Sequence, residues 1–305
     1  MSKFPSVGFS AKPVPHQIKS MDALAASFDS AGLRYRMAYN SHIPEKVAVV
    51  WGWGRAKEIR KTNPEAIILC LDHGYTWNRK QYVNTAWSTP EHQFGLNGFG
   101  EHAIVDDGGE RSRAHGWWDE LKPVRGCGGS LTALLLGQVY GDAMIVDHVE
   151  DYGAWLRERS EQLQANGYSV AFRPHPNMVL RGNVERYGNV GSRTFGTLAE
   201  DLATCCLATA MNSNALVQAY TEGVPFVQAF NRGSMLWPLI GEPGACADTT
   251  PANREKWWAR LAYCQWTYAE LADGTWMRYH RPILERLVEG GPLRPWWQTT
   301  EDYEQ

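Results

Sequence analysis

The sequence predicts an α/β protein with two Rossmann-like domains that face each other across a cleft, followed by a C-terminal helical segment. Three observations predict it. Short apolar runs rich in β-branched residues alternate with helix-compatible segments, which is the pattern of parallel sheets covered by helices. A glycine-rich stretch, 123–130, interrupts this alternation. The chain has 305 residues, enough for two domains.

The first half contains three expected strands and one expected helix. The strands are 33–38, 46–53 and 65–71, and the polar segment 55–62 between the last two is helix-compatible. The run 65–71 (EAIILCL) is continuously apolar, as is typical of a strand buried on both faces. Residues 76–116 lack periodicity, so we expect an irregular segment of functional importance.

The second half alternates more regularly. Strands are expected at 131–139, 168–173, 205–211 and 224–230, and helices at 149–165, 197–203 and 213–222. Residues 251–290 are expected to be entirely helical. These patterns divide the chain into a first domain, 1–128, a second domain, 129–250, and C-terminal helices, 251–305, that pack back on both domains.

The composition excludes several classes of protein. Hydrophobic residues make up 44% and charged residues 21%, so the chain is not intrinsically disordered. A net charge of −3 argues against a broad basic surface for nucleic acid, although the first half has local basic clusters. The 14 tryptophans are expected mainly in packing.

The sequence also predicts the cellular compartment. Six cysteines without a C-x-x-C pair are expected to be reduced, buried thiols in a cytoplasmic protein. The first residues lack the apolar region of a secretory signal, and no apolar run is long enough to span a membrane.

Polar side chains follow three expected strands of the second half. They are Gln138 and Asp142 after the first strand, Arg173 and His175 after the second, and Asn212, Ser213 and Asn214 after the third. Because ligands of parallel sheets bind beyond the carboxyl ends of the strands, we expect these residues to line one edge.

The segment Arg173–Pro176 and the start of the following helix at Ser213 favour phosphate binding. Arg173 and His175 each precede a proline, which pushes both into extended geometry, and a cation beside an imidazole suits a phosphate. A helix start offers free N–H groups to an anion. The alternatives are a histidine in a turn and an ordinary helix cap.

At this point the second half, over roughly 133–228, resembles the donor domain of GT-B glycosyltransferases. It is nearest to the capsule polysaccharide β-Kdo transferases and more remotely similar to bacterial sialyltransferases. The matching residues are Gln138, Asp142, Arg173, Pro174, His175, Pro176, Ser213, Ala219, Gly223 and Pro225. Gln218 stands where the family has Glu, and an amide binds a ribose diol more weakly than a carboxylate does.

The resemblance implies a nucleotide-sugar donor, linked to CMP or UDP, with no other cofactor and no metal. His175 and Ser213 would hold the donor phosphate and stabilise the charge of the departing nucleotide. The implied donor set is completed by Gln138, Asp142, Arg173, Asn212, Asn214 and Gln218. No D-x-D motif is present at a place where a metal-dependent transferase would need it.

An inverting transfer needs a base, and the resemblance implies where it lies. The family has a Glu-Asp-Gly-aromatic turn after a strand of the first domain, and Asp72-His73-Gly74-Tyr75 stands there. Asp72 is the favoured base and His73 is its rival. The alternative is an aspartate that caps a local turn.

A second resemblance involves the first half. Gly74-Tyr75, Arg79 and the segment 96–100 (LNGFG) are similar to a pattern in phage-encoded GT-B-like proteins, some of which glycosylate hydroxymethylated bases in DNA. It implies that Tyr75, Arg79 and Asn97 bind the acceptor, which would be a hydroxymethylated pyrimidine in phage DNA.

Three functions therefore remain open. A glycosyltransferase is favoured, with modified DNA or a glycan as acceptor, the latter including a capsule or lipopolysaccharide-type transfer of Kdo or a related CMP-sugar. A nucleotide-sugar epimerase or hydrolase on the same scaffold is the second. A non-catalytic protein that binds a nucleotide or sugar is the third, which Gln218 and the divergent turn at Asp72-His73 keep open.

Overall fold

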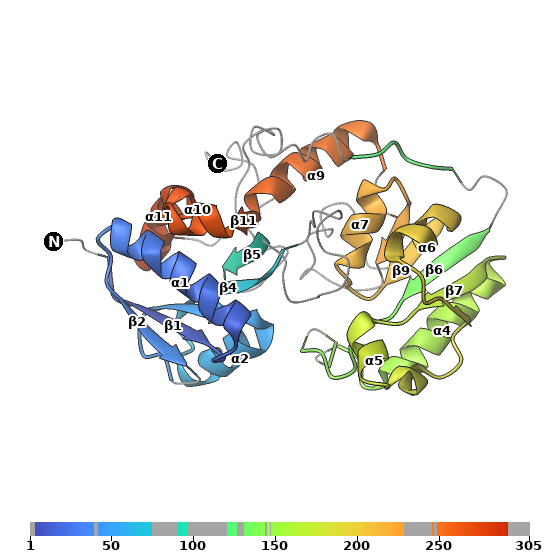
Figure 1. Ribbon diagram of the computed structural model, residues 1–305, viewed down its shortest axis with the longest axis horizontal. Helices are drawn as coiled ribbons and strands as arrows, with labels where there is room; N and C mark the ends of the chain where they lie inside the picture. Colours follow the sequence, from blue (N-terminus) through green and yellow to red (C-terminus); the bar gives the residue numbers. More distant parts are fainter. Residues whose placement is uncertain are drawn as a thin grey trace. The chain divides into compact units, whose positions relative to one another are not determined.

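The computed structural model describes residues 4–39, 42–74, 91–96, 121–126, 131–143, 145–146, 148–228, 246 and 249–291. The chain forms two compact units, the first from residues 1–111 and 259–305 and the second from residues 112–258. Each unit contains a sheet with helices packed against it (Figure 1). The α/β class expected from the sequence is confirmed, while the three-part division at residues 128 and 250 stays a prediction.

The first unit contains a six-stranded sheet. Its strands are β1 (Val7–Ala11), β2 (Tyr35–Tyr39), β3 (Val47–Trp51), β4 (Ile67–His73), β5 (Glu91–Leu96) and β11 (Gln265–Thr267), in the order β11-β5-β4-β3-β1-β2. The strands β1 to β4 are parallel, and β5 is antiparallel to both β4 and β11. The winding direction therefore reverses between β1 and β3, which makes that point the topological switch of this sheet.

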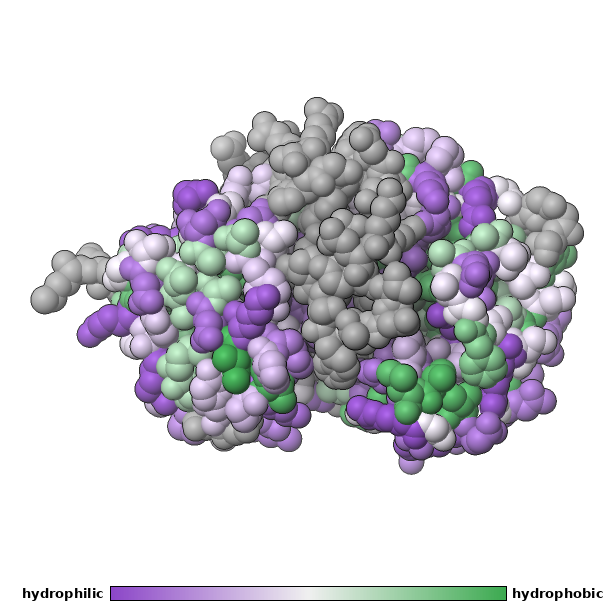
Figure 2. Space-filling model, in the orientation of Figure 1, coloured by the Kyte–Doolittle hydropathy of each residue, from purple (hydrophilic) through white to green (hydrophobic). Residues whose placement is uncertain are grey.

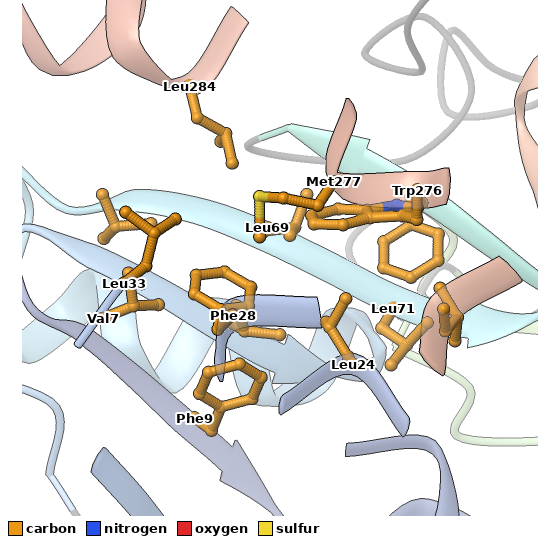
Figure 3. Packing of buried hydrophobic residues seen from close by; sticks show 14 of the residues in the cluster. Val7, Phe9, Leu24, Phe28, Leu33, Leu69, Leu71, Trp276, Met277 and Leu284 are labelled. Carbon is orange, nitrogen blue, oxygen red and sulfur yellow. The ribbon is translucent and has the colours of Figure 1, made fainter. Parts of the chain in front are cut away.

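The described helices of this unit are α1 (Pro15–Ser30), α2 (Gly52–Thr62), α10 (Tyr268–Ala272) and α11 (Thr275–Val288). A large apolar core joins α1 and α11 to the strands. Figure 3 shows Leu24 and Phe28 of α1 close to Trp276 and Met277 of α11 over the sheet. Phe28 packs edge-on against Phe9, with ring centroids 5.2 Å apart. Segments from opposite ends of the chain thus share one core.

The second unit contains a five-stranded, entirely parallel sheet. Its strands are β6 (Thr132–Leu136), β7 (Ser169–Arg173), β8 (Ser192–Arg193), β9 (Leu207–Ala210) and β10 (Phe226–Gln228), in the order β10-β9-β6-β7-β8. Counted from β6 this is the order 3-2-1-4-5 of dinucleotide-binding folds, with its switch point between β6 and β9.

The helical elements within the described residues of this unit are short, apart from α4. They are α4 (Tyr152–Ala165), α5 (Pro176–Leu180), the 3-10 helix η3 (Val184–Tyr187), α6 (Leu198–Thr204) and α7 (Ala215–Thr221). The helix α9 (Pro251–Tyr263) begins in the second unit and ends in the first. The surface near α5 is hydrophobic (Figure 2), where the side chain of Leu180 is 79% exposed.

Two expectations about secondary structure are wrong. Residues 91–96 form β5 within the segment 76–116 expected to be irregular, and β11 interrupts the helical segment 251–290. The two strands pair with each other, and Trp266 of β11 is opposite His92 of β5. Short strands depend on the neighbouring strands with which they pair, so local periodicity does not reveal them.

Candidate functional site

The switch point of the second unit is closed by an amide pair. Gln138 follows β6 and Asn212 follows β9, the two neighbouring strands between which the winding reverses. The backbone N–H of Asn212 donates to Oε1 of Gln138 over 3.0 Å, and Nε2 of Gln138 donates to Oδ1 of Asn212. The predicted residues Gln138 and Asn212 are therefore brought together. Gln138 is only 8% exposed, and both polar atoms of its amide bind Asn212 and so connect the ends of β6 and β9.

His175 stands at the end of the neighbouring strand β7. It has the extended backbone that the following proline imposes, with φ −64° and ψ 135°, and it is the N-cap of α5. Its Nδ1 accepts a hydrogen bond from the backbone N–H of Asn177 over 3.1 Å. The neutral ring must then carry its proton on Nε2, which leaves that N–H as a donor.

Burial lowers the pKa of His175, and the charge of Asp142 opposes this shift. The ring is therefore neutral at pH 7. An anion bound beside it would raise the pKa of His175, as the charge of Asp142 does. Asp142 thus lies in the electrostatic neighbourhood of His175, as the strand-end argument predicted.

Arg173 has a partner within the protein. Its Nη1 forms an ion pair with Oδ2 of Asp201 over 2.6 Å and donates to the carbonyl of Gly196 over 2.7 Å. Thr194 donates to the same carboxylate oxygen over 2.8 Å. The charge of Arg173 is therefore compensated and anchors α6, and its expected contact with a phosphate stays a prediction that this ion pair disfavours.

The remaining predicted donor residues lie at the start of α7 and along it. Ser213 Oγ accepts from the backbone N–H of Ala215 over 3.2 Å. Asn214 is the N-cap of α7, but its side chain makes no capping hydrogen bond. Gln218 is half-buried within the helix, and its carbonyl accepts from Glu222 N and Thr221 Oγ1. Their contact with a donor stays a prediction.

Two buried tyrosines that the sequence analysis did not single out hold the main chain of Gln138. Tyr187 donates to its carbonyl over 2.8 Å, and the Gln138 N–H donates to the hydroxyl of Tyr152 over 2.9 Å. Both rings pack in the core of the second unit. The only sequence signal for them is an aromatic residue among polar ones, which does not distinguish a hydrogen-bonding role from packing.

In the first unit, the predicted base candidates lie at the carboxyl end of β4. Oδ1 of Asp72 accepts from the backbone N–H of His73 over 2.7 Å. Gly52, at the start of α2, has a positive φ of 76°, and a Cβ placed on it would lie 3.8 Å from Oδ2 of Asp72. This left-handed turn brings the end of β3 beside the carboxylate. The predicted acceptor residues Tyr75, Arg79 and Asn97 lie outside the described residues.

His73 belongs to a cluster of rings at the switch point of the first unit. Its ring centroid is 5.4 Å from that of His16 and 5.2 Å from that of Trp51. Trp51 also lies 5.3 Å from His16 and 6.0 Å from His92, measured between ring centroids. His16 follows β1 and Trp51 ends β3, so the cluster lies at the switch point between these two strands. Sequence reasoning missed His16 and His92, which are far apart in the chain.

Burial suppresses the charge of this cluster. Burial, reinforced by the neighbouring His16, lowers the pKa of His73 to about 4. Burial also lowers the pKa of His92 to about 4, against the effect of its hydrogen bond with the Trp266 carbonyl. Since that carbonyl can only accept, Nδ1 of His92 carries the proton, and Nε2 lies 2.8 Å from the hydroxyl of Ser20. The imidazoles are neutral at pH 7.

Three other features of the described ranges were expected from the sequence or bear on the proposed chemistry. No group of three or more His, Cys, Asp or Glu side chains within them is placed to hold a metal ion. None of the helices described is long and apolar enough to cross a membrane. Among the cysteines within the described ranges, Cys70, Cys205, Cys206 and Cys264 are buried, whereas Cys246 is exposed.

Comparison with known proteins relates the chain through its fold. No protein-family profile matches the sequence. No curated protein matches it either. Among solved structures, it is similar to the β-Kdo 2,7 transferase of Thermosulfurimonas dismutans KpsC, with a TM-score of 0.53, 12% identity, and coverage of 89% of this chain and 99% of that one.

A second structure agrees with the first. The β-Kdo 2,4 transferase of the same KpsC protein matches with a TM-score of 0.51 and 12% identity, over 85% of this chain and 90% of that one. At this identity the likeness concerns the fold alone. The expected fold is confirmed: the chain has the GT-B fold of these glycosyltransferases.

Proposed function

We propose that this chain is a glycosyltransferase that moves a sugar from a nucleotide-activated donor to an acceptor hydroxyl. One observation carries the proposal: Gln138 and Asn212, which the sequence marks as donor residues, meet at the switch point of a 3-2-1-4-5 sheet within a GT-B fold, and His175 stands at the end of the adjacent strand β7. Ligands of such sheets bind at this point. The donor is CMP- or UDP-linked, and the second unit binds it.

In the proposed reaction the sugar anomeric carbon loses its bond to the phosphate oxygen and forms one to the acceptor oxygen. The nucleotide leaves with the electrons of the broken bond, and negative charge grows on its phosphate. The Nε2–H of His175, fixed by the Asn177 contact, donates to that phosphate, and Ser213 is proposed to assist it. Protein donors carry the stabilisation, so the reaction is proposed to need no metal.

The acceptor proton goes to a base of the first unit, and attack from the face opposite the leaving group inverts the anomeric centre. We assign the base to Asp72. Burial and the neighbouring His16 lower the pKa of His73 to about 4, so His73 is a weak base at neutral pH. Asp72 lies at the same strand end, where its carboxylate is proposed to take the proton of the acceptor hydroxyl.

Of the two acceptors that the sequence suggests, we favour a glycan because of the rings at the first switch point. The ring cluster of His16, Trp51 and His73 at the first switch point offers aromatic faces and imidazole nitrogens, which suit a sugar. Hydroxymethylated phage DNA is the other acceptor that the sequence suggests. Of the residues that suggest it, only Gly74 and Leu96 lie within the described ranges.

Thermal unfolding with CMP, UDP, GDP and ADP at millimolar concentration tests the donor site first. A nucleotide at about 100 times its dissociation constant stabilises the folded chain by about 2.7 kcal/mol. We expect CMP or UDP to raise the melting temperature, and His175→Ala to abolish the rise. His148→Ala, at an exposed histidine of the same unit, should preserve it. No rise with any nucleotide would contradict the proposed donor site.

Transfer is then measured with the matching nucleotide sugar and two acceptors, a Kdo-terminated oligosaccharide and duplex DNA that contains 5-hydroxymethylcytosine. We expect His175→Ala to lower kcat about 10²- to 10³-fold, and Asp72→Asn to lower it about 10²- to 10⁴-fold. His73→Gln should retain most of the activity if Asp72 is the base. Consumption of donor without acceptor would instead indicate a hydrolase or epimerase, and binding without turnover a binding protein.

A further inference from the structure

Gln138, His175 and Asn212 of the proposed donor site follow three different strands. Hydrogen bonds connect the ends of these strands. The amide of Gln138 joins the end of β6 to the end of β9. The end of β6 is also joined to the end of β7, through the hydroxyl of Tyr187. This second link bears directly on where His175 stands.

The hydroxyl of Tyr187 makes one hydrogen bond in each direction. It donates to the carbonyl of Gln138 over 2.8 Å and accepts from the backbone N–H of His175 over 3.3 Å. Tyr187 is fully buried. Burial raises the pKa of Tyr187 to about 12, so the hydroxyl keeps the proton that it donates.

The ring of Tyr187 is held in place from several sides. It packs edge-on against Phe172, with centroids 5.0 Å apart and planes at 71°. It approaches the backbone at Gly137, where a Cβ would lie 3.2 Å from Cζ of Tyr187 and 3.0 Å from Cζ of Phe172. A glycine at 137 thus allows the ring to lie against the strand end, and the hydroxyl reaches both main chains from a fixed position.

We infer that Tyr187 is a positioning residue of the donor site, whose hydroxyl sets His175 against Gln138 and, through the Gln138 amide, against Asn212. The inference rests on the proposed function for its consequence, which is the alignment of the Nε2–H donor with the donor phosphate. Tyr187 itself touches no substrate in this role. Its hydroxyl acts through the backbone of His175.

Tyr187→Phe removes both hydrogen bonds and keeps the ring, and the chain offers two matched controls. Tyr152→Phe removes the hydroxyl that accepts from the Gln138 N–H, so it disturbs the same residue without a contact to His175. Tyr140→Phe removes a hydroxyl that donates to the carbonyl of Arg186 over 2.5 Å, in the same group of rings. A merely structural role would make Tyr187→Phe and Tyr152→Phe behave alike.

The first readout is the affinity for CMP and UDP by calorimetry. We expect Tyr187→Phe to weaken binding of the nucleotide that the wild type prefers at least fivefold, and Tyr140→Phe to change it less than twofold. Tyr152→Phe should lower the melting temperature about as much as Tyr187→Phe, with a smaller loss of affinity. Equal affinity of Tyr187→Phe and wild type would overturn the inference.

The second readout does not depend on nucleotide binding. ¹⁵N chemical shifts of the His175 ring report which nitrogen carries the proton. The wild type and Tyr152→Phe should show the Nε2–H form, whereas Tyr187→Phe should show a mixture, because its loop no longer holds Nδ1 against Asn177. An unchanged ring in Tyr187→Phe would overturn the inference. If no nucleotide binds the wild type, the proposed function fails, but this measurement still decides the position of His175.

A measurement on the wild type covers the case in which Tyr187→Phe does not fold. The backbone amide of His175 is bonded to a buried hydroxyl, so its hydrogen exchange should be protected at least as strongly as that of the half-buried Asn177 amide. Exchange of the His175 amide at the rate of an unprotected amide would overturn the inference.

Discussion

The switch points of the two sheets are built by different means. In the second unit hydrogen bonds connect the strand ends, through the amide of Gln138 and the hydroxyl of Tyr187. In the first unit the strand ends carry rings in edge-on and tilted contact, with His16, Trp51 and His73 within 5.4 Å of one another by centroid distance. Hydrogen bonds fix direction, whereas ring contacts fix separation and exclude water.

The two edges also treat histidine charge differently. Burial and the neighbouring His16 both lower the pKa of His73, to about 4. Burial lowers the pKa of His175 too, but Asp142 opposes the shift. A nearby carboxylate favours the protonated form of a histidine, and a bound donor phosphate would favour it further because it adds negative charge. This difference fits a donor site in the second unit.

The largest expected effect is a loss of stability in the first unit that leaves the second unit unchanged. Trp276 is fully buried in the core of the first unit, where its ring stacks on His280 at 4.3 Å between centroids. Trp276→Ala should lower the free energy of unfolding of that unit by about 3–5 kcal/mol. Hydrogen exchange should show lost protection in β1, β3 and β4, with β6 and β9 unchanged. Arg278→Ala, at an exposed position of the same helix, should change stability by less than about 0.5 kcal/mol.

Equal loss of protection in both sheets would contradict the division of stability between the units.

The suppressed histidines of the first unit should make stability depend on pH. In the unfolded chain an imidazole binds a proton below about pH 6.5, but folded His92 does so only near its pKa of about 4. The unfolded state binds more protons in this window, so stability is greatest above pH 6.5 and falls as the pH falls towards 4. We expect His92→Gln to reduce the loss between pH 7 and pH 5 by about 1–2 kcal/mol.

Urea unfolding at pH 7, 6 and 5 measures this slope. His42→Gln, which replaces an exposed histidine of the same unit, is the matched control variant. His175→Gln should reduce the slope less than His92→Gln does, since Asp142 offsets part of the shift in the second unit. Identical slopes for His92→Gln and wild type would show that the ring cluster does not suppress protonation.

Gly137→Ala tests how closely the hydrogen-bonded edge is packed. Its Cβ would lie 3.2 Å from the Arg173 carbonyl oxygen, which the sheet holds, and close to the rings of Phe172 and Tyr187. Such crowding costs about 1–3 kcal/mol. Gly126→Ala, where a Cβ meets nothing within 4 Å, should be neutral or stabilise by up to about 1 kcal/mol. Thermal unfolding of both variants makes the comparison, and a neutral Gly137→Ala would mean that this edge can yield.

The smallest effects concern two helix starts, one in each unit. Thr197 and Glu200 form a capping box on α6, and Thr267 and Glu270 form one on α10. Each Thr→Ala change should cost about 0.5–2 kcal/mol. Thr267→Ala should be nearer the upper value, because Glu270 is only 9% exposed and loses a hydrogen-bond partner when the threonine hydroxyl is removed. Thr267→Ser, which keeps the hydroxyl, should restore most of the loss in chemical denaturation; failure to do so would exclude the cap as the cause.

Much of the fold and part of the site could be predicted from the sequence. Strands such as β4 and β7 are marked by apolar runs, and the prolines after Arg173 and His175 fix extended geometry locally. Because parallel strands end at one edge, the sequence order alone predicts that Gln138, His175 and Asn212 come near one another. These are consequences of local chemistry and of one topological rule.

Tertiary structure decided the rest. The ion pair between Arg173 and Asp201, the ring cluster around Trp51 and the bridge through Tyr187 all depend on residues brought together by packing. Likewise, β11 is a strand because it pairs with β5, about 170 residues away in the chain, and β5 lies between β4 and β11. A side chain's type is written in the sequence, but whether it faces a ligand, a counter-ion or a neighbouring ring depends on contacts that only the folded chain creates.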